Sequence, residues 1–240
     1  LTNVGFGGAP ASPELQQRVR DTFPNATANV AIGYGSSETV GVVASFGGAD
    51  YEAEPTATGH VLPTMQVQIR NERDRQVGPG VNGRVCVRSA YSMLGYWNNP
   101  AATAETIDDD FWLDTGDVGR VVDGLLFIDS RARDMILHNG ENVYPVEIEY
   151  RLDAHPDIEE SAVYGLDDTQ SGQAVAASVV PAPGRSLDAD DLTAWCAETL
   201  AGFKVPTRWD IRTEQLPRNA AGKVVKGALS GERDFTAHDD

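Results

Sequence analysis

The segment GYGSSE, Gly33–Glu38, holds the densest group of side chains able to contact a phosphorylated ligand. Glycines flank Tyr34, whose ring could stack on a base. Ser36 and Ser37 offer hydroxyls to phosphate oxygens, and Glu38 offers a carboxylate to Mg²⁺, which prefers oxygen ligands. An ordinary helix start, capped by a serine and with the glutamate in its first turn, is the alternative.

Two further segments offer a carboxylate and a cation. In LDTGDVG, Leu113–Gly119, Asp117 stands between glycines after an expected strand, where a carboxylate can accept two hydrogen bonds from a ribose diol. In LPRNAAGKVVK, Leu216–Lys226, Lys223 follows a glycine-containing turn, where a lysine can act as a point charge on a developing anion. An Asp-Gly turn and an exposed surface lysine are the competing explanations.

Two more segments rich in turn residues complete the set. GGAP, Gly7–Pro10, follows a short expected strand. Its glycines let the backbone approach a flat ligand and its proline fixes the turn, although a plain tight turn would have the same composition. SRARDMILHNGENVYPVEIE, Ser130–Glu149, holds a basic cluster, a short apolar strand, a glycine-centred hairpin and a helix that begins at Pro145.

The first half of the chain is predicted to have mixed α/β structure. Ser12 is a good N-cap for a helix with Pro13 at its first position. Residues 29–32 predict a short strand that runs into a glycine-rich turn. Alternation over residues 58–87 predicts β-hairpins or a small barrel, and a strand around residues 125–128 leads to the basic cluster.

From Arg133 onward the pattern predicts a compact α+β unit of about 100 residues, an ordinary domain size. Helices are expected over residues 145–152, 187–200 and 223–229, and strands over residues 161–165, 174–180 and 208–211. The predicted fold class is therefore α/β plus α+β, in two domains of residues 1–132 and 133–240.

Composition and charge narrow the classes of function. The formal net charge of −17 disfavours a nucleic-acid binder, because phosphate backbones would be repelled. No apolar run approaches the ~20 residues that span a bilayer. Cys86 and Cys196 have no metal-ligand spacing, which indicates two small core residues in a reducing, cytoplasmic setting. The sequence begins without Met or a signal segment, and we interpret it as part of a longer protein.

Together and in this order, the five segments resemble the motifs of the adenylate-forming superfamily, which includes acyl-CoA synthetases, the adenylation domains of peptide synthetases and firefly luciferase. The resemblance extends over nearly all of the 240 residues. GYGSSE is similar to the family's Tyr-Gly-x-Thr-Glu signature, with Ser37 in place of threonine. YSMLGYWNNPAAT, Tyr91–Thr103, is similar to the acyl-CoA synthetase branch, as are GENVYPVEIE and PRNAAGK.

The resemblance implies an ATP-dependent acid–thiol ligase. A carboxylic acid, expected to be a fatty or aryl acid, attacks the α-phosphate of Mg²⁺-bound ATP to give an acyl-adenylate and pyrophosphate. The thiol of CoA then displaces AMP, so ATP, Mg²⁺ and CoA are the expected cofactors. Residues 1–132 would be the C-terminal part of the large AMP-binding domain, with α/β and small β-barrel portions, and residues 133–240 the small mobile C-terminal domain.

The resemblance also implies roles for single positions of the large domain. The backbone of Gly8–Pro10 and the ring of Tyr34 would hold adenine, and Asp117 would bind the ribose. Glu38 would be a catalytic residue that binds Mg²⁺. The full set of implied ATP- or AMP-binding residues is Gly8, Ala9, Pro10, Gly33, Tyr34, Gly35, Ser36, Ser37, Asp117 and Arg131.

In the small domain, the resemblance makes Lys223 the second catalytic residue, which stabilises charge at the α-phosphate and orients the carboxylate. Arg133 aligns with the family hinge, where Asp or Lys is usual. A rotation there would exchange Lys223 for the hairpin that follows residue 138. Asn139, Gly140 and Glu141 would contact CoA, although relatives commonly have glycine or serine at the first of these positions.

Three other functions stay open at this point. An adenylating enzyme that loads the thiol of a carrier protein has the same motifs, as does a luciferase-type oxygenase. A non-catalytic AMP-binding module would keep the same fold. The similarity of residues 217–223 to bacterial acyl-CoA synthetases adds the hypothesis that a protein lysine acetyltransferase acts on Lys223 and removes its charge.

We predict that the isolated 240-residue chain releases no pyrophosphate above background with ATP, Mg²⁺ and varied carboxylic acids. In the family that the chain resembles, a Lys-containing phosphate loop and most of the acyl pocket precede the GGAP segment, and this sequence contains neither. A pyrophosphate-release assay measures the outcome. Robust turnover would contradict the interpretation of the chain as part of a longer enzyme.

Overall fold

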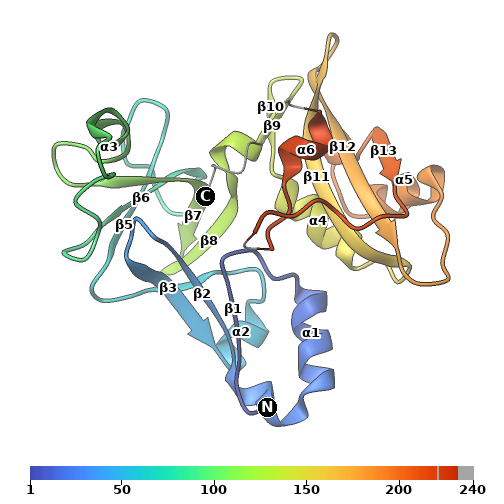
Figure 1. Cartoon of the computed structure of the whole chain (residues 1–240), viewed down its shortest axis with the longest axis horizontal. Helices are drawn as coiled ribbons and strands as arrows, with labels where there is room; N and C mark the ends of the chain where they lie inside the picture. Colours follow the sequence, from blue (N-terminus) through green and yellow to red (C-terminus); the bar gives the residue numbers. More distant parts are fainter. Residues whose placement is uncertain (221, 232–240) are drawn as a thin grey trace. The chain divides into compact units, whose positions relative to one another are not determined.

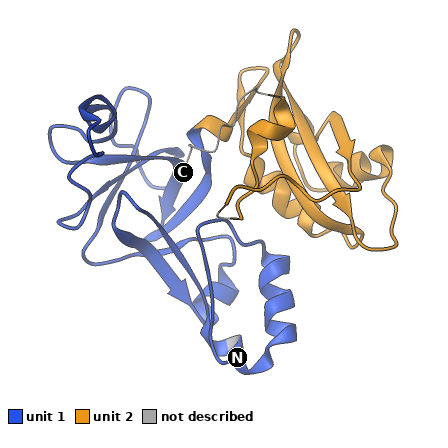
Figure 2. Cartoon of the chain, viewed as in Figure 1, with its two compact units in different colours: residues 1–132 blue, residues 133–240 orange. Residues whose placement is uncertain are grey.

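The computed structural model describes residues 1–220 and 222–231. The chain forms two compact units, which we call unit 1, Leu1–Ala132, and unit 2, Arg133–Asp240 (Figure 2). In neither unit do the described residues include a helix long and apolar enough to cross a membrane.

Unit 1 is built on an eight-stranded sheet with the order β1-β2-β3-β4-β8-β7-β6-β5 (Figure 1). β1 and β2 are parallel, and the other neighbouring pairs are antiparallel. The hairpin predicted within residues 58–87 is confirmed as β5–β6. The strands are β1 (Val4–Gly7), β2 (Val30–Ser36), β3 (Gly41–Gly47), β4 (Gly59–Val61), β5 (Gln66–Arg70), β6 (Gly83–Arg88), β7 (Leu113–Val122) and β8 (Leu125–Arg131).

Helix α1 (Pro13–Thr22) lies between the parallel strands β1 and β2 in the chain, since parallel strands need a long crossover connection. The predicted cap is confirmed: the Ser12 hydroxyl accepts a hydrogen bond from Leu15 N at 3.3 Å, and proline occupies the first turn. The other helical segments of unit 1 are the 3-10 helix η1 (Pro24–Asn29), α2 (Ala49–Ala53) and α3 (Pro100–Thr106).

Two buried clusters form the core of unit 1. One joins β3, β6 and β8 through Val43, Val85 and Leu126. The other joins β2 and α2 through Val30 and Tyr51. These clusters hold the strand register, because a slip by one residue would turn the apolar side chains of a strand to the opposite face.

Two segments predicted as turns are strands. The sequence predicts a glycine-rich turn after residue 32, but β2 continues to Ser36 because residues 33–36 pair with β3. The sequence also predicts that Asp117 follows a strand. It lies inside β7 instead, where it pairs with Arg131 of β8. The polar groups of both segments are therefore placed by sheet pairing.

Unit 2 has a five-stranded sheet of order β10-β9-β12-β11, with β13 paired in parallel to β12. The element that starts at the boundary is the 3-10 helix η2 (Ala132–Asp134). The others are β9 (Ile136–His138), β10 (Glu141–Val143), α4 (Pro145–Asp153), β11 (Ile158–Asp168), β12 (Gly172–Pro181), α5 (Ala189–Ala197), the 3-10 helix η3 (Gly202–Lys204), β13 (Arg208–Ile211) and α6 (Lys226–Ser230).

The core of unit 2 combines the sheet with α4 and α5. Ile148 and Leu152 of α4 are fully buried, as are Leu192 and Cys196 of α5. The four belong to one cluster with apolar residues of β11 and β12. The helix predicted from Pro145 is thereby confirmed.

Two helices of unit 2 are shorter than the sequence predicts. α5 begins at Ala189, because the Asp188 side chain accepts a hydrogen bond from Asp190 N at 2.9 Å and so caps the helix there. The tail helix α6 begins at Lys226, so that Lys223 stands in the turn before it. Gly222, with a φ of +81°, keeps this turn out of helical geometry.

Both cysteines are buried and free, as the sequence predicts for core residues. Cys86 lies on β6 and Cys196 on α5, and burial raises the pKa of each thiol to about 11. Because the thiolate is the nucleophilic form, thiols with this pKa are unreactive near neutral pH.

We predict that Gly35→Ala destabilises the protein by about 1–3 kcal/mol, the cost of overpacking. A methyl group at Gly35 would lie 1.9 Å from the carbonyl oxygen of Gly41, where β2 shifts its register against β3. Thermal unfolding measures the change. Gly33→Ala is the matched control on the same strand, because its methyl group would meet only Val42, at 3.7 Å. Equal stability of the two variants would contradict the prediction.

Candidate functional site

The centre of the candidate site is a hydrogen bond between β2 and β7. The Tyr34 hydroxyl donates to Asp117 Oδ2 at 2.6 Å. A bond of this length to a carboxylate is charge-assisted and about twice as strong as one between neutral groups. The two side chains come from different motif segments, and the structure brings them into direct contact.

Two neighbours hold Asp117 in place. Its backbone N–H donates to Thr115 Oγ1 at 3.2 Å, and the Thr115 hydroxyl donates to Val85 O at 2.9 Å. Arg131 Nε lies 3.9 Å from Asp117 Oδ1. The arginine side chain is 49% exposed and that of the aspartate 17%, so the cation lies on the solvent side of the carboxylate.

Burial, followed by the negative charge of Asp117, raises the pKa of Tyr34 well above its usual value. The phenol therefore stays protonated at every physiological pH and remains a hydrogen-bond donor. The carboxylate consequently keeps one fixed partner while its other edge faces Arg131.

The residues after Tyr34 lead into a tight turn that is held by side-chain hydroxyl groups. Ser36 N donates to Thr39 Oγ1 at 2.9 Å, and Thr39 N donates to Ser36 Oγ at 3.3 Å. The Thr39 hydroxyl also donates to Gly41 O at 2.9 Å, and Thr39 is only 1% exposed. These bonds fix the turn from inside, whereas Ser36 and Ser37 are exposed at its surface.

Glu38 lies in a cleft of about 210 Å³. Its Oε1 accepts a hydrogen bond from the Tyr96 hydroxyl at 3.1 Å. Burial raises the pKa of Glu38, but hydrogen bonds from its own amide, Ser36 and Tyr96 and the charge of Arg131 outweigh burial and lower it. The other residues that line the cleft are Ser36, Thr106, Leu113, Asp114, Thr115 and Gly116.

An ionised carboxylate at the mouth of a cleft fits Mg²⁺. This ion commonly binds proteins through one or two carboxylates and completes its shell with water and substrate phosphates. Across residues 1–220 and 222–231, no group of three or more His, Cys, Asp or Glu side chains could hold a metal by itself. Glu38 is therefore suited to a metal that arrives together with a phosphorylated substrate.

The GGAP segment adjoins β2. Gly7 at the end of β1 pairs with Gly33, and a Cβ added to Gly7 would lie 3.3 Å from Gly33 O. Gly8 follows with a φ of +76°, and residues 8–10 are exposed. The segment thus begins at the last paired residue of β1, the strand that neighbours β2, and residues 8–10 follow beyond the pairing.

The remaining predicted site residues belong to unit 2. The Arg133 side chain is 66% exposed. Asn139 and Gly140 form the two-residue turn between β9 and β10, and Glu141 begins β10. Lys223 is exposed in the turn before α6. The hairpin and the Lys223 turn are separate features of the unit.

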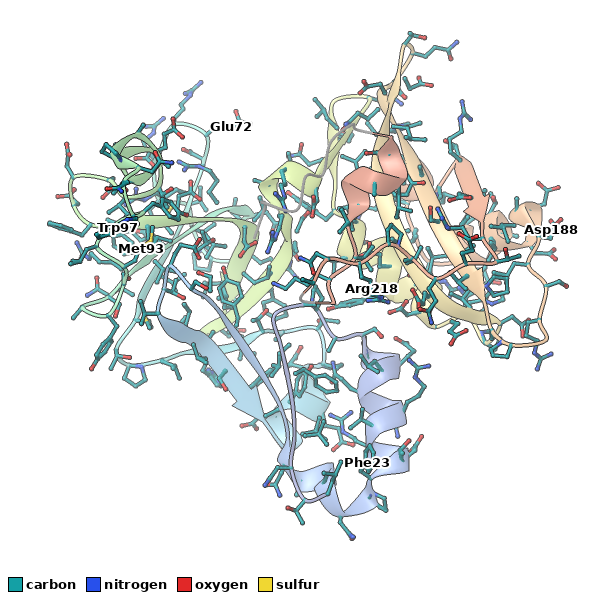
Figure 3. All side chains as sticks on the ribbon, viewed as in Figure 1. Phe23, Glu72, Met93, Trp97, Asp188 and Arg218 are labelled. Carbon is teal, nitrogen blue, oxygen red and sulfur yellow. The ribbon has the colours of Figure 1, made fainter. Side chains whose placement is uncertain are left out.

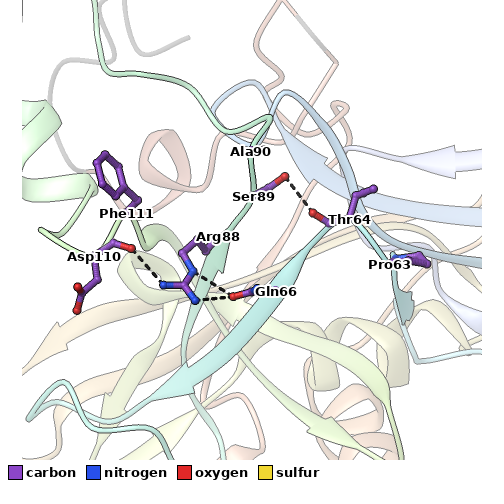
Figure 4. Close-up of a pocket in the computed structure, with 8 residues that line it drawn as sticks. All are labelled: Pro63, Thr64, Gln66, Arg88, Ser89, Ala90, Asp110 and Phe111. Atoms are coloured by element: carbon purple, nitrogen blue, oxygen red, sulfur yellow. Dashed lines mark hydrogen bonds between the residues drawn. The ribbon is translucent and has the colours of Figure 1, made fainter.

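A larger cavity, of about 440 Å³, lies elsewhere in unit 1 and contains none of the predicted residues (Figure 4). Its arginine is already engaged, because Arg88 donates to Gln66 Oε1 at 2.7 Å and to Asp110 O at 3.4 Å. The cavity is lined by Pro63, Thr64, Gln66, Arg88, Ser89, Ala90, Asp110 and Phe111.

The fold of the chain, with an α/β unit and an α+β unit, matches solved structures of adenylate-forming enzymes. An amide bond synthetase from Marinactinospora thermotolerans matches 96% of the chain with a TM-score of 0.88 and 35% identity, over 46% of its own length. The o-succinylbenzoate CoA synthetase of Bacillus subtilis, solved with its acyl-adenylate intermediate, matches 97% of the chain with a TM-score of 0.85 and 28% identity, over 46% of its own length.

The family models agree with the fold. The AMP-binding enzyme model matches residues 1–97, and the AMP-binding enzyme C-terminal domain model matches residues 147–223. The chain belongs to the AMP-binding enzyme family.

Curated relatives are ligases. The 3-[(3aS,4S,7aS)-7a-methyl-1,5-dioxo-octahydro-1H-inden-4-yl]propanoyl:CoA ligase of Rhodococcus jostii is 41% identical over 96% of the chain and 42% of its own length. A fatty acid–[acyl-carrier-protein] ligase of Streptomyces coeruleorubidus is 36% identical over 95% of the chain and 44% of its own length. The chain thus spans less than half the length of these relatives.

Three residues of the site are ones that the sequence analysis does not single out. Thr39 directly follows the GYGSSE segment, and Thr115 lies inside LDTGDVG. Each threonine accepts a hydrogen bond from a backbone amide two or three residues away, a local pattern that the sequence could have indicated. Tyr96 is 58 residues from its partner Glu38, and no local pattern indicates that the two meet.

We predict that Tyr34→Phe lowers the free energy of unfolding by about 1.5–3 kcal/mol at pH 7, the usual range for a hydrogen bond to a charged group. Because the folded-state pKa of Tyr34 is raised, its contribution is fully present below the unfolded pKa of about 10 and declines above it. The stability difference between the wild type and the variant should therefore shrink above pH ~10. Denaturant unfolding across this pH range measures it.

Tyr91→Phe is the control for this experiment. Tyr91 is 59% exposed, so its loss of a hydroxyl should change the unfolding free energy by less than about 0.5 kcal/mol at any pH. A stability deficit of Tyr34→Phe that stays constant through pH ~11 would contradict a raised folded-state pKa of Tyr34.

Proposed function

We propose that the whole protein is an ATP-dependent acyl-CoA synthetase, which activates a carboxylic acid as an acyl-adenylate and transfers the acyl group to CoA. The observation that carries the proposal is the 2.6 Å hydrogen bond between Tyr34 and Asp117. It brings two motif segments, 83 residues apart in the chain, into direct contact, so that one ligand could meet both.

In this proposal unit 1 is the C-terminal part of the AMP-binding domain. The backbone of residues 8–10 and the ring of Tyr34 hold adenine, Asp117 accepts hydrogen bonds from the ribose hydroxyls, and Arg131 reaches the nucleotide from the same side. The exposed turn of Ser36 and Ser37 contacts the phosphates.

Glu38 is the residue proposed to bind Mg²⁺, and its lowered pKa supports this role because the carboxylate is ionised at neutral pH. The ion would offset the charge of the phosphates. Glu38 itself orients toward the cleft through the hydrogen bond from Tyr96.

The reaction proposed has two displacements. A carboxylate oxygen attacks the α-phosphorus, the bond to pyrophosphate breaks, and Lys223 stabilises the charge that builds on the phosphoryl oxygens. The thiolate of CoA then attacks the acyl carbon, and AMP leaves. Between the steps, rotation at Arg133 would replace Lys223 by the hairpin of residues 139–141, which would guide the thiol.

The acceptor and the acid are proposed by class. CoA is the proposed thiol, because a CoA ligase is among the relatives. The alternative is the thiol of a carrier protein, which is supported by the relative that is an acyl-carrier-protein ligase. A fatty or aryl acid is the proposed substrate. A non-catalytic AMP-binding module would have no need of an ionised carboxylate in the cleft.

We predict that the full-length protein catalyses acid-dependent exchange of pyrophosphate into ATP, and that Lys223→Ala lowers this rate about 100- to 1,000-fold, as loss of a group that stabilises the transition state does. A panel of carboxylic acids identifies the substrate, and thioester formation with CoA should exceed that with acyl-carrier protein.

Lys204→Ala is the matched control for Lys223→Ala. Lys204 Nζ forms an ion pair with Glu147 at 2.6 Å, and neither residue is among the proposed site residues, so the variant should keep the wild-type exchange rate. Binding of AMP by the full-length protein without any acid-dependent exchange would favour the non-catalytic module.

A further inference from the structure

We propose that Arg218 and Glu160 are a positioning pair that fixes the backbone of Lys223 for the adenylation step. The inference rests on the proposed function, because Lys223 is the side chain that the pair would position. Arg218 is labelled in Figure 3, and neither residue of the pair is among the predicted site residues.

Lys223 stands at the tip of a loop that is closed at its base and braced across its tip. Val225 N donates to Pro217 O at 2.8 Å at the base. At the tip, Asn219 N donates to Lys223 O at 2.9 Å, and Lys223 N donates to Asn219 Oδ1 at 3.0 Å. The backbone N–H and the carbonyl of Lys223 are therefore both held by hydrogen bonds to Asn219.

The guanidinium of Arg218 joins this tip to strand β11. Arg218 Nη2 donates to Glu160 Oε2 at 3.0 Å, and Arg218 Nη1 donates to Gly222 O at 3.0 Å. The Gly222 carbonyl belongs to the peptide bond that contains the amide of Lys223. One planar group with fixed donors thus connects a sheet residue to the peptide bond at Lys223.

Glu160 provides a fixed anchor for the guanidinium. Its side chain is 16% exposed, against 43% for Arg218, and Oε2 also accepts a hydrogen bond from Leu216 N at 3.2 Å. Leu216 is buried in a cluster with Ala162 and Val180. The carboxylate of Glu160 is thus held near the core, and the direction of the guanidinium is fixed with it.

A second ion pair holds the other end of the loop. Lys226 Nζ lies 2.7 Å from Glu149 Oε1, which also accepts a hydrogen bond from Val163 N at 2.8 Å. This arrangement ties the start of α6 to α4 and β11. With both ends tied, the bond from Arg218 to Gly222 is a further restraint, placed at the peptide bond next to Lys223.

The step in which the pair matters follows from the proposed mechanism. Displacement of a catalytic group by about 1 Å can lower a rate about 100-fold. Lys223 is proposed to act in adenylation and to leave before acyl transfer. Loss of the pair should therefore slow adenylation and leave the transfer from a preformed acyl-adenylate unchanged.

The test uses the full-length enzyme and measures the two half-reactions separately. Arg218→Ala and Glu160→Gln should lower the rate of pyrophosphate exchange about 10- to 100-fold, while CoA-dependent consumption of supplied acyl-adenylate keeps its wild-type rate. Arg218→Lys should recover only part of the loss, because an ammonium is a point charge that cannot span two acceptors as the guanidinium does. Arg185→Ala, which breaks an ion pair with Asp157 at 3.1 Å, is the matched control and should leave both rates unchanged.

A double variant separates positioning from folding. If Arg218 acts through Lys223, adding Arg218→Ala to Lys223→Ala should cost no further rate. Equal losses in both half-reactions, or additive losses in the double variant, would overturn the inference. If Arg218→Ala kept the wild-type exchange rate while Lys223→Ala lost it, the positioning role of the pair would be overturned and the proposed function would stand. If the wild-type enzyme showed no acid-dependent exchange, both the proposed function and this inference would be overturned.

Discussion

The hydrogen bond between Tyr34 and Asp117 requires the sheet of unit 1 to curve. β3, β4 and β8 lie between the two strands that carry these residues, so a flat sheet would hold the strands about 19 Å apart, four spacings of about 4.8 Å. That is more than the two side chains can bridge, yet they meet at 2.6 Å. β4 is short, and a Cβ added to its Gly59 would lie 2.4 Å from the backbone of Ser45. Only glycine allows β3 and β4 to approach this closely, and the candidate site depends on the curvature of the sheet that they belong to.

The electrostatics of the site are local. A net charge of −17 opposes the binding of a polyanion, but the field of distant charges is screened beyond about 8 Å at physiological ionic strength. The acidic groups of the site each have close partners: Asp117 has a phenol and Arg131, Asp114 has Arg84, and Glu38 has hydroxyls. With these carboxylates paired, the exposed hydroxyls of the turn after β2 and the half-exposed arginine determine what a phosphate would meet.

Much of the fold can be predicted from patterns among neighbouring residues, whereas features that depend on the pairing of distant strands cannot. The cap at Ser12 and the alternation of β5 and β6 depend on neighbouring residues, so the sequence predicts them. From the sequence alone, the glycines of β2 and β7 predict turns. At Gly119, however, a Cβ would lie 2.1 Å from Phe127 O, so this glycine is needed because two strands lie close together. Tyr34 and Asp117 could each be named from a motif. Their contact depends on sheet order, which no local pattern contains.

Two turns of unit 2 are proposed to serve successive steps of one reaction, so each must keep its shape without the bound nucleotide. Asn139 and Gly140 have φ values of 53° and 82°, both left-handed, as a two-residue type I′ turn requires. The Lys223 turn is held instead by hydrogen bonds to its own backbone. Arg133 contrasts with both, because it is 66% exposed and its ion pair, at 3.8 Å, is with the adjacent Asp134. A rotation confined to a few residues can bring a turn to its place of action only if the turn already has its final conformation. The hairpin turn and the Lys223 turn meet this condition, because each is fixed by its own backbone geometry or hydrogen bonds.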